Sequence, residues 1–254
     1  MNKIVFISGS SSGIGKACAE IFAKNGDRII LNGRRIDRIN QVEEQLRSEF
    51  GTETFQANFD VRNRVEVERV LNGLPDEWKP IDILINNAGL ALGLSPIHEG
   101  DPDQWETMID TNIKGLLNVT GIISKWMVER KQGHIINLSS IAGLQVYPNG
   151  NIYCATKHAV EALSKAMRID LVSYGIKVTS ICPGAVETEF SIVRFSGDVE
   201  RAKQAYKTFN PLTPMDIAES IFFVANRPSN VNINELTIMP LAQANTYVTH
   251  KKAI

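Results

Sequence analysis

A tyrosine and a lysine, Tyr153 and Lys157, lie four residues apart in the sequence. On a helix this spacing places both side chains on one face, one turn apart, so the ammonium group can act on the phenol. An unperturbed tyrosine has a pKa of about 10, and a nearby cation in a site that excludes water lowers this value. The spacing therefore indicates a phenolic acid–base catalyst, although it also arises by chance in many amphipathic helices.

A glycine-rich segment separates a predicted strand at residues 3–8 from a predicted helix at residues 16–25. It reads Ser8-Gly9-Ser10-Ser11-Ser12-Gly13-Ile14-Gly15. Glycines let the backbone approach a pyrophosphate closely, and a helix N-terminus offers unpaired N–H groups and a favourable dipole to negative charge. The spacing G-x-x-x-G-x-G differs from the G-x-G-x-x-G of many dinucleotide sites. The order of strand, glycines and helix nevertheless predicts a dinucleotide cradle.

Two arginines, Arg34 and Arg35, follow the second predicted strand. NAD-binding sites usually place an Asp or Glu here, which accepts hydrogen bonds from the adenosine ribose hydroxyls. Guanidinium groups suit a 2′-phosphate instead, and the missing carboxylate removes a source of repulsion. We therefore expect NADP(H) rather than NAD as the cofactor. A solvated pair of loop arginines is the alternative interpretation.

The elements that must position these residues alternate between short β-branched runs and longer helical patterns. Strands are predicted at residues 3–8, 28–32, 52–59, 81–86, 134–139, 177–182 and 235–239. This alternation predicts an α/β protein with a single-domain Rossmann fold over residues 1–254, a doubly wound parallel seven-stranded sheet with helices on both faces. Apolar periodicity over residues 37–50 predicts a helix packed on that sheet, and the irregular segment 183–210 predicts a substrate loop.

Composition excludes several classes of protein. The formal net charge is −1 and the basic residues are scattered, so no nucleic-acid partner is expected. The N-terminal apolar run is too short for a signal peptide and no run is long enough to span a bilayer, so we expect a cytoplasmic protein without a membrane partner. The 3 cysteines and 4 histidines show no ligand spacing, which predicts free thiols and no metal site.

Further motifs carry a resemblance to a known family. Asn86-Asn87-Ala88-Gly89 follows the fourth predicted strand, Asn112 lies within residues 110–115, Ser140 precedes Tyr153 by thirteen residues, and Pro183-Gly184 follows the sixth strand. Together with the glycine-rich segment, and in this order over residues 3–240, they resemble the classical short-chain dehydrogenase/reductase family. Ser8 and Thr156 stand where the family often has threonine and serine, and both keep a hydroxyl group.

The resemblance implies a catalytic tetrad of Asn112, Ser140, Tyr153 and Lys157. Ser140 would orient the substrate oxygen, and Tyr153 would exchange a proton with that oxygen as hydride moves to or from the nicotinamide. Lys157 would bond the nicotinamide ribose and favour the tyrosinate, and Asn112 would hold a water that links Lys157 to solvent. Ser139 could compete for the role of Ser140, but the family spacing favours Ser140.

The resemblance also implies the cofactor contacts. Asp60 and Val61 are expected beside the adenine, Asn87 against the adenosine ribose and Thr188 at the nicotinamide carboxamide, whereas Asn86 is expected to brace the strands. The expected cofactor-binding residues are Gly9, Ser11, Ser12, Gly13, Ile14, Gly15, Arg34, Arg35, Asp60, Val61, Asn87, Ala88, Gly89, Tyr153, Lys157, Pro183, Gly184, Val186 and Thr188.

Four segments narrow the range of substrates that the protein is expected to use. Residues 74–78, 88–93, 189–195 and 230–234, with the closing run Met239-Pro240-Leu241-Ala242-Gln243, resemble the NADP-dependent serine/L-allo-threonine dehydrogenase subgroup. Its members also act on other 3-hydroxy acids and reduce malonic semialdehyde, which implies a small hydroxy acid or carbonyl substrate. Such a substrate needs its carboxylate recognised, so Arg194 is expected to pair with it beside Ser140 and Tyr153. A surface arginine in a loop is the alternative.

Two other functions stay open at this point. The same tetrad serves 3-oxoacyl thioester reductases and general carbonyl reductases, and the same fold can serve as a non-catalytic, nucleotide-sensing regulator. The intact tetrad argues against the regulator, and no basic groove supports nucleic-acid binding. The resemblance also implies a homotetramer, built partly from the helices that carry Asn112 and Tyr153.

Overall fold

The computed structural model describes residues 2–195, 197–204, 206–207 and 209–250. One sheet of seven parallel strands runs through the molecule in the order β3-β2-β1-β4-β5-β6-β7. Its strands are β1 (Ile4–Ile7), β2 (Arg28–Leu31), β3 (Thr54–Gln56), β4 (Ile83–Asn86), β5 (Gly133–Leu138), β6 (Ile176–Pro183) and β7 (Glu235–Ile238). The seven predicted strands and the doubly wound parallel sheet are therefore confirmed.

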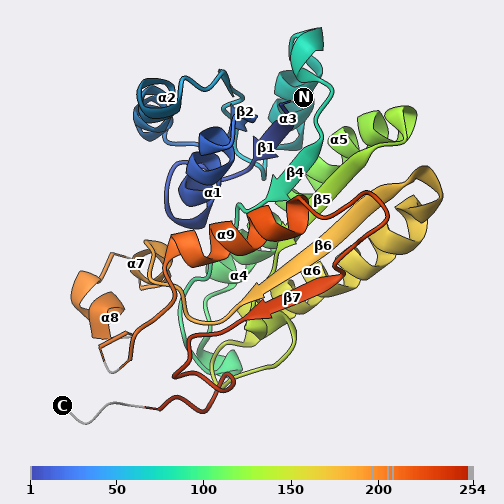
Figure 1. The fold of residues 1–254 in the computed structure, drawn as a ribbon. Coiled ribbons are helices and arrows are strands. Elements are labelled where there is room, and N and C mark those ends of the chain that lie inside the picture. Colours follow the sequence, from blue (N-terminus) through green and yellow to red (C-terminus); the bar gives the residue numbers. More distant parts are fainter. Residues whose placement is uncertain (1, 196, 205, 208, 251–254) are drawn as a thin grey trace.

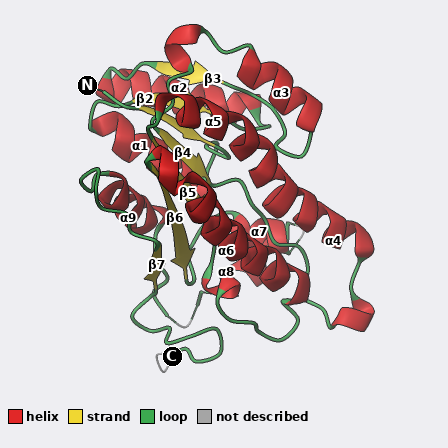
Figure 2. Ribbon diagram, turned by 90° about the vertical axis from the view of Figure 1, so that its right-hand side faces the viewer, coloured by secondary structure: helices red, strands yellow, loops and turns green. Residues whose placement is uncertain are grey.

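Helices cover both faces of this sheet (Figures 1 and 2). One face is covered by α1 (Gly13–Lys24), α2 (Ile36–Phe50) and α9 (Pro214–Ala225). The other is covered by α3 (Arg64–Asn72), α5 (Leu116–Arg130) and α6 (Asn151–Leu171), with α4 (Pro102–Ile109) leading into α5 through a π-helical turn, Asp110–Gly115. The predicted helix over residues 37–50 is α2, and its apolar residues Ile39, Val42 and Leu46 are buried on the sheet as expected.

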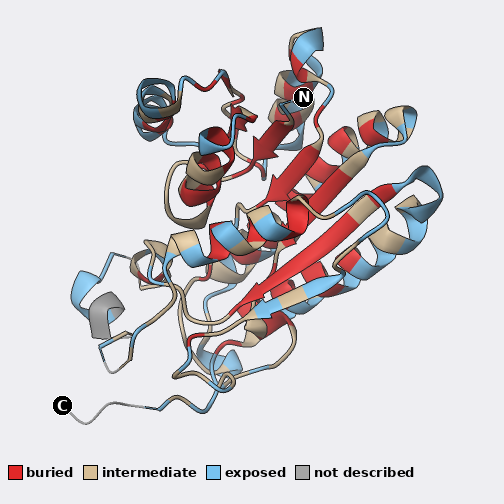
Figure 3. Cartoon of the chain, in the orientation of Figure 1, coloured by how far each residue is buried: buried red, intermediate tan, exposed pale blue. Residues whose placement is uncertain are grey.

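Strand β1 shows why the central strands are apolar throughout. All four of its residues are buried, with Val5 and Ile7 facing the α1 side and Ile4 and Phe6 facing the α3 side. Successive side chains of a strand point to opposite faces, so a strand covered on both faces needs an unbroken apolar run. The buried layer accordingly runs along the middle of the sheet and the inner faces of the helices (Figure 3).

Two boundaries differ from the sequence prediction. Helix α1 begins at Gly13 rather than at residue 16, so two glycines lie in its first turn. The segment 183–210 is not wholly irregular, because it contains the short helices α7 (Phe190–Arg194) and α8 (Val199–Gln204). These helices are too short for sequence periodicity to reveal. Residues 196, 205 and 208 of the predicted substrate loop lie outside the described part of the chain.

The order of the strands fixes where a ligand can bind. The connections leaving β1 and β4, which are neighbours in the sheet, run to opposite faces and leave a crevice at the carboxyl edge. Gly9 follows β1 and Asn87 follows β4 at this edge, and the two residues touch there. Among the described residues, no helix has the length and apolarity that crossing a membrane requires.

Candidate active site

The glycine-rich segment forms a tight turn against the strand β4 side of the crevice. Gly9 has a positive φ of 67°, a backbone conformation that residues other than glycine rarely adopt. A Cβ atom on Gly15 would lie 2.4 Å from the carbonyl oxygen of Gly9, so a side chain there would push the loop and helix α1 apart. The side-chain amide of Asn87 donates to the carbonyl oxygens of Ser8 and Gly9, at 2.8 and 3.0 Å. The turn therefore depends on glycine at both positions.

The N-terminus of α1 opens into the crevice. Ser12 occupies the N-cap position but makes no side-chain hydrogen bond to the helix. Its hydroxyl instead accepts from Nη2 of Arg35 at 2.7 Å, and the same nitrogen donates to Ser11 at 3.1 Å. The first N–H groups of α1 and an arginine thus lie together, which is an arrangement suited to phosphate.

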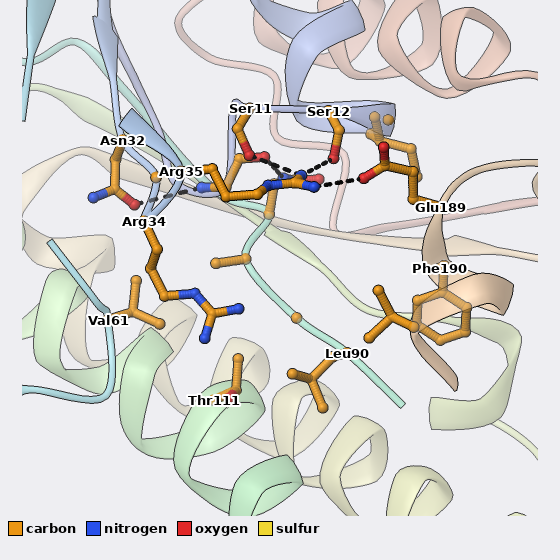
Figure 4. A pocket seen from close by; sticks show the side chains of 18 of the residues that line it. Ser11, Ser12, Asn32, Arg34, Arg35, Val61, Leu90, Thr111, Glu189 and Phe190 are labelled. Carbon is orange, nitrogen blue, oxygen red and sulfur yellow. Dashed lines mark hydrogen bonds and ion pairs between the residues drawn. The ribbon is translucent and has the colours of Figure 1, made fainter. Parts of the chain in front are cut away.

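The two arginines after β2 take different positions (Figure 4). Arg34 extends into the cleft beside Val61, and its nearest charged partner is Asp60, at 3.6 Å. Arg35 crosses the mouth of the cleft and pairs with Glu189 at 2.8 Å. The guanidinium of Arg34 is therefore the more available of the two to a ligand. Both terminal nitrogens of Arg35 already donate hydrogen bonds within the protein.

Glu189 joins the cofactor side of the cleft to the segment before α7. Its carboxylate pairs with Arg35 and also with Arg38 on α2. Burial by itself raises the pKa of Glu189, but the hydrogen bonds and charges of the two arginines outweigh it, so the pKa is lowered overall. The carboxylate thus stays ionised and acts as a tie across the cleft.

Most of the expected cofactor residues line one cleft. They are Gly9, Ser11, Ser12, Gly13, Ile14, Arg34, Arg35, Asp60, Val61, Asn87, Ala88, Gly89 and Thr188. Gly15 lies below the cleft in α1 and supports it by close packing. Pro183, Gly184 and Val186 line the adjoining pocket with Tyr153, Lys157 and Ser140, and Thr188 borders both cavities. Asn86 braces the strands as expected, because its amide donates to Thr120 and Asn137.

Tyr153 lies near the start of α6, with 8% of its surface exposed. Burial raises the pKa of the phenol, and a hydrogen bond with the side chain of Ser140 acts in the opposite direction without cancelling the effect. The neighbouring Ser139 is buried against Gly143, so Ser140 is the serine placed for contact with the phenol. In the protein alone, Tyr153 is therefore a protonated acid at neutral pH.

Lys157 is buried one turn beyond Tyr153, as the spacing predicted. Its ammonium donates to the carbonyl oxygen of Leu138 at 2.8 Å and lies 5.9 Å from the centre of the Tyr153 ring. Burial lowers the pKa of Lys157 to about 8, although Cys182 and Glu161 oppose this shift. The expectation that Lys157 lowers the pKa of Tyr153 is not met in the protein alone, because burial of the phenol dominates.

Asn112 lies within the π-helical turn and lines neither cavity. Its side chain accepts from the backbone N–H of Leu90 and donates to the Leu90 carbonyl, both at 2.8 Å, and also donates to the hydroxyl of Thr156 at 3.0 Å. It therefore ties the chain after β4 to the helix that carries Tyr153 and Lys157. Its expected contact with a water stays a prediction.

Arg194 points into the pocket that Tyr153 lines. Its guanidinium donates to the hydroxyl of Tyr147 at 2.9 Å and to the carbonyl of Gly93 at 3.2 Å, and it lies 5.8 Å from the centre of the Tyr153 ring. Phe190, one turn earlier, packs edge-on against the same ring at 5.6 Å. Arg194 is thus a half-buried cation beside the phenol and not a free surface residue.

Several lining residues were missed by the sequence analysis. Tyr147, Phe190, Tyr206, Gln243 and Thr246 complete the pocket around Tyr153 and Arg194, and Glu189 completes the cofactor cleft. Glu189, Phe190 and Gln243 belong to the segments that carry the subgroup resemblance, but nothing in the sequence shows that they line the site. Tyr147, Tyr206 and Thr246 lie in no motif. The described residues contain no group of three or more His, Cys, Asp or Glu that could hold a metal ion.

Residues 3–198 match the family model described as short chain dehydrogenase. The chain belongs to the short-chain dehydrogenase/reductase family. The resemblance inferred from the motifs is therefore confirmed.

Individual members of the family are similar over nearly their full length. An NADP-dependent 3-hydroxy acid dehydrogenase, YdfG, from Salmonella typhimurium is 46% identical over 242 residues, covering 95% of this chain and 96% of that protein. A serine 3-dehydrogenase from Rhizobium radiobacter is 44% identical, with 96% of each chain covered. The closed form of a serine dehydrogenase complexed with NADP+ superposes with a TM-score of 0.91 at 43% identity, covering 98% of this chain and 100% of that one.

Proposed function

We propose that this protein transfers a hydride between NADP(H) and the hydroxyl or carbonyl group of a small 3-hydroxy acid. The observation that carries this proposal is the placement of the Arg194 guanidinium within 5.8 Å of the Tyr153 ring. A fixed cation beside an acid–base phenol suits a substrate that carries a carboxylate near its reacting carbon. The names of the serine and 3-hydroxy acid dehydrogenases that it resembles support the same substrate class.

NADP is the cofactor that the cleft favours. Arg34 and Arg35 stand where an NAD-binding site usually has a carboxylate, and Arg34 points into the cleft. A 2′-phosphate can accept hydrogen bonds from guanidinium groups, whereas the hydroxyl of NAD gains little from them. The related serine dehydrogenase bound to NADP+ supports this assignment.

The side chains of this chain divide the work of the reaction. The bound nicotinamide supplies or accepts the hydride. Tyr153 donates a proton to the carbonyl oxygen during reduction and recovers it during oxidation, while Ser140 orients that oxygen. Burial keeps the phenol protonated in the protein alone, so this form is ready for reduction. Lys157, one turn away, holds positive charge near the phenol when protonated.

A substrate panel tests this function. L-Serine, L-allo-threonine, 3-hydroxypropionate, malonic semialdehyde, an acetoacetyl thioester and a neutral secondary alcohol are assayed with both NADP(H) and NAD(H). We expect the highest kcat/KM for a 3-hydroxy acid or its carbonyl form with NADP(H). A higher kcat/KM for the thioester or the neutral alcohol would assign a general reductase instead, and binding of NADPH without any turnover would assign a regulator.

The homotetramer also stays a proposal. Half-exposed apolar residues such as Ile109 and Leu117, on α4 and α5, provide surface that subunits could cover. Light scattering of the purified protein measures the mass that decides this point.

A further inference from the structure

A third ionisable residue follows Tyr153 and Lys157 on α6 at the same spacing. Glu161 lies one turn beyond Lys157 and two turns beyond Tyr153, so the three side chains share one face of the helix. Only 3% of Glu161 is exposed, compared with 6% of Lys157 and 8% of Tyr153. A carboxylate is rarely buried to this extent without a compensating partner.

Strand β6 holds the Glu161 carboxylate in place. One oxygen accepts a hydrogen bond from the hydroxyl of Ser180 at 3.0 Å, and the other accepts from the thiol of Cys182 at 3.2 Å. Ser180 and Cys182 are two residues apart, so both point to the same face of the sheet, toward α6. Each carboxylate oxygen is therefore satisfied by a neutral donor that brings no charge.

Lys157 is the buried cation nearest to Glu161 along α6, one turn away. The ammonium of Lys157 is itself held by a neutral group, the carbonyl oxygen of Leu138. Burying one charge alone is costly, whereas opposite charges in a shared apolar region offset part of each other's desolvation penalty. Burial lowers the pKa of Lys157, and interactions with Cys182 and then Glu161 raise it against that effect.

We propose that Glu161 is a positioning residue that keeps Lys157 protonated and therefore keeps positive charge behind the Tyr153 phenol. The proposal rests on the hydride-transfer function proposed above, in which Lys157 serves Tyr153. Glu161 does not reach the pocket, and it acts only through Lys157. The surrounding groups that carry or acquire charge are Lys157 and Arg168 on α6, Cys182 on β6 and Glu235 on β7. Arg168 is held by the carbonyl oxygens of Val178 and Asn234. The short turn Ile141–Gly143, which also packs on α6, carries no ionisable side chain.

The test is the pH profile of reduction by Glu161→Gln. Glutamine keeps the shape but removes the negative charge. Its amide oxygen can accept from one of Ser180 and Cys182, and its NH2 group can donate to the other. Lys157 should then lose its proton at lower pH, so the alkaline fall of kcat should move about one pH unit lower, with about tenfold less activity at pH 9. Activity at pH 6, where Lys157 stays protonated in both proteins, should change less than about twofold by the same relation.

Two further variants control for charge and for structure. Asp170→Asn removes the same charge from an exposed position on the same helix and should leave the profile unchanged. Glu161→Asp keeps the charge and should return the alkaline limb toward that of the wild type, which tests the proposal even where Glu161→Gln does not fold. An unmoved limb in Glu161→Gln, or an equal loss of kcat at every pH, would overturn the proposal.

A measurement without turnover separates this proposal from the proposed function. In protein with isotopically labelled lysine, the Lys157 signal should titrate about one pH unit lower in Glu161→Gln than in the wild type. That shift is expected whatever substrate the panel identifies. An unchanged Lys157 titration would overturn the role of Glu161 and leave the proposed function untouched.

Discussion

The cofactor cleft and the substrate pocket are built in different ways. The cleft is formed mainly by short turns that directly follow β1, β2 and β4, and its shape depends on backbone contacts such as Gly9 with Asn87. The pocket includes Arg194 and Thr246, which are held by contacts with residues 101 positions away along the chain. Arg194 donates to the carbonyl of Gly93, and the backbone N–H of Thr246 donates to the side chain of Gln145. The comparison suggests that cofactor binding is a property of the sheet edge, whereas substrate choice is a property of the added segments.

The largest effect is expected at Tyr153, which lines the substrate pocket. Tyr153→Phe removes the proton donor and keeps the ring, so kcat should fall by about 10³-fold, within the usual range for acid–base catalysis. The Kd for NADPH, followed by its fluorescence, should change little because the cleft is unaltered. Substantial remaining turnover would refute the role of Tyr153, and lost NADPH binding would show that the two regions are not separable.

An intermediate effect is expected from Arg194, which belongs to the pocket alone. Arg194→Ala removes a charged hydrogen-bond donor and should raise KM for L-serine by about 10- to 100-fold. KM for a neutral secondary alcohol should change far less, and Arg194→Lys should recover part of the loss. Equal increases for both substrates would place Arg194 in the packing of the pocket and not in carboxylate recognition.

A smaller effect is expected from the arginines of the cleft. Arg34→Ala should raise the Kd for NADPH by about tenfold and leave the Kd for NADH nearly unchanged, because only NADPH carries the 2′-phosphate. Arg35→Ala should reduce the preference for NADPH over NADH by a smaller factor, since Arg35 is already bound to Ser11, Ser12 and Glu189. Comparable kcat/KM with both cofactors in the wild type would contradict the assignment of NADP.

The sequence was sufficient for the parts of the molecule that depend on neighbouring residues. The apolar runs of the strands, the glycines after β1 and the four-residue spacing of Tyr153 and Lys157 are local patterns, and each lies where it was predicted. Helix α1 begins three residues before the predicted residue 16. The difference arises because glycine is unfavourable within a helix, which argues against a start at Gly13. Here the close contact of Gly15 with Gly9 requires glycine.

Features that depend on the folded structure could not be predicted. The tie between Glu189 and Arg35 joins residues 154 positions apart, and no motif marks it. The direction in which the pKa of Tyr153 is shifted depends on how deeply the phenol is buried, and a helical spacing does not reveal that burial. The π-helical turn that places Asn112 against Leu90 and Thr156 likewise has no simple sequence signal.

The wall that the two cavities share has a kinetic consequence. Thr188 and Phe190 border both the cofactor cleft and the substrate pocket, and Glu189 between them is tied to the arginines of the cleft. A dinucleotide bound in the cleft would therefore form one wall of the substrate pocket, and a hydroxy acid would bind against that wall. We therefore expect an ordered mechanism, in which the coenzyme binds first and leaves last. Inhibition by excess substrate, through a dead-end complex with the spent coenzyme, is the expected kinetic signature.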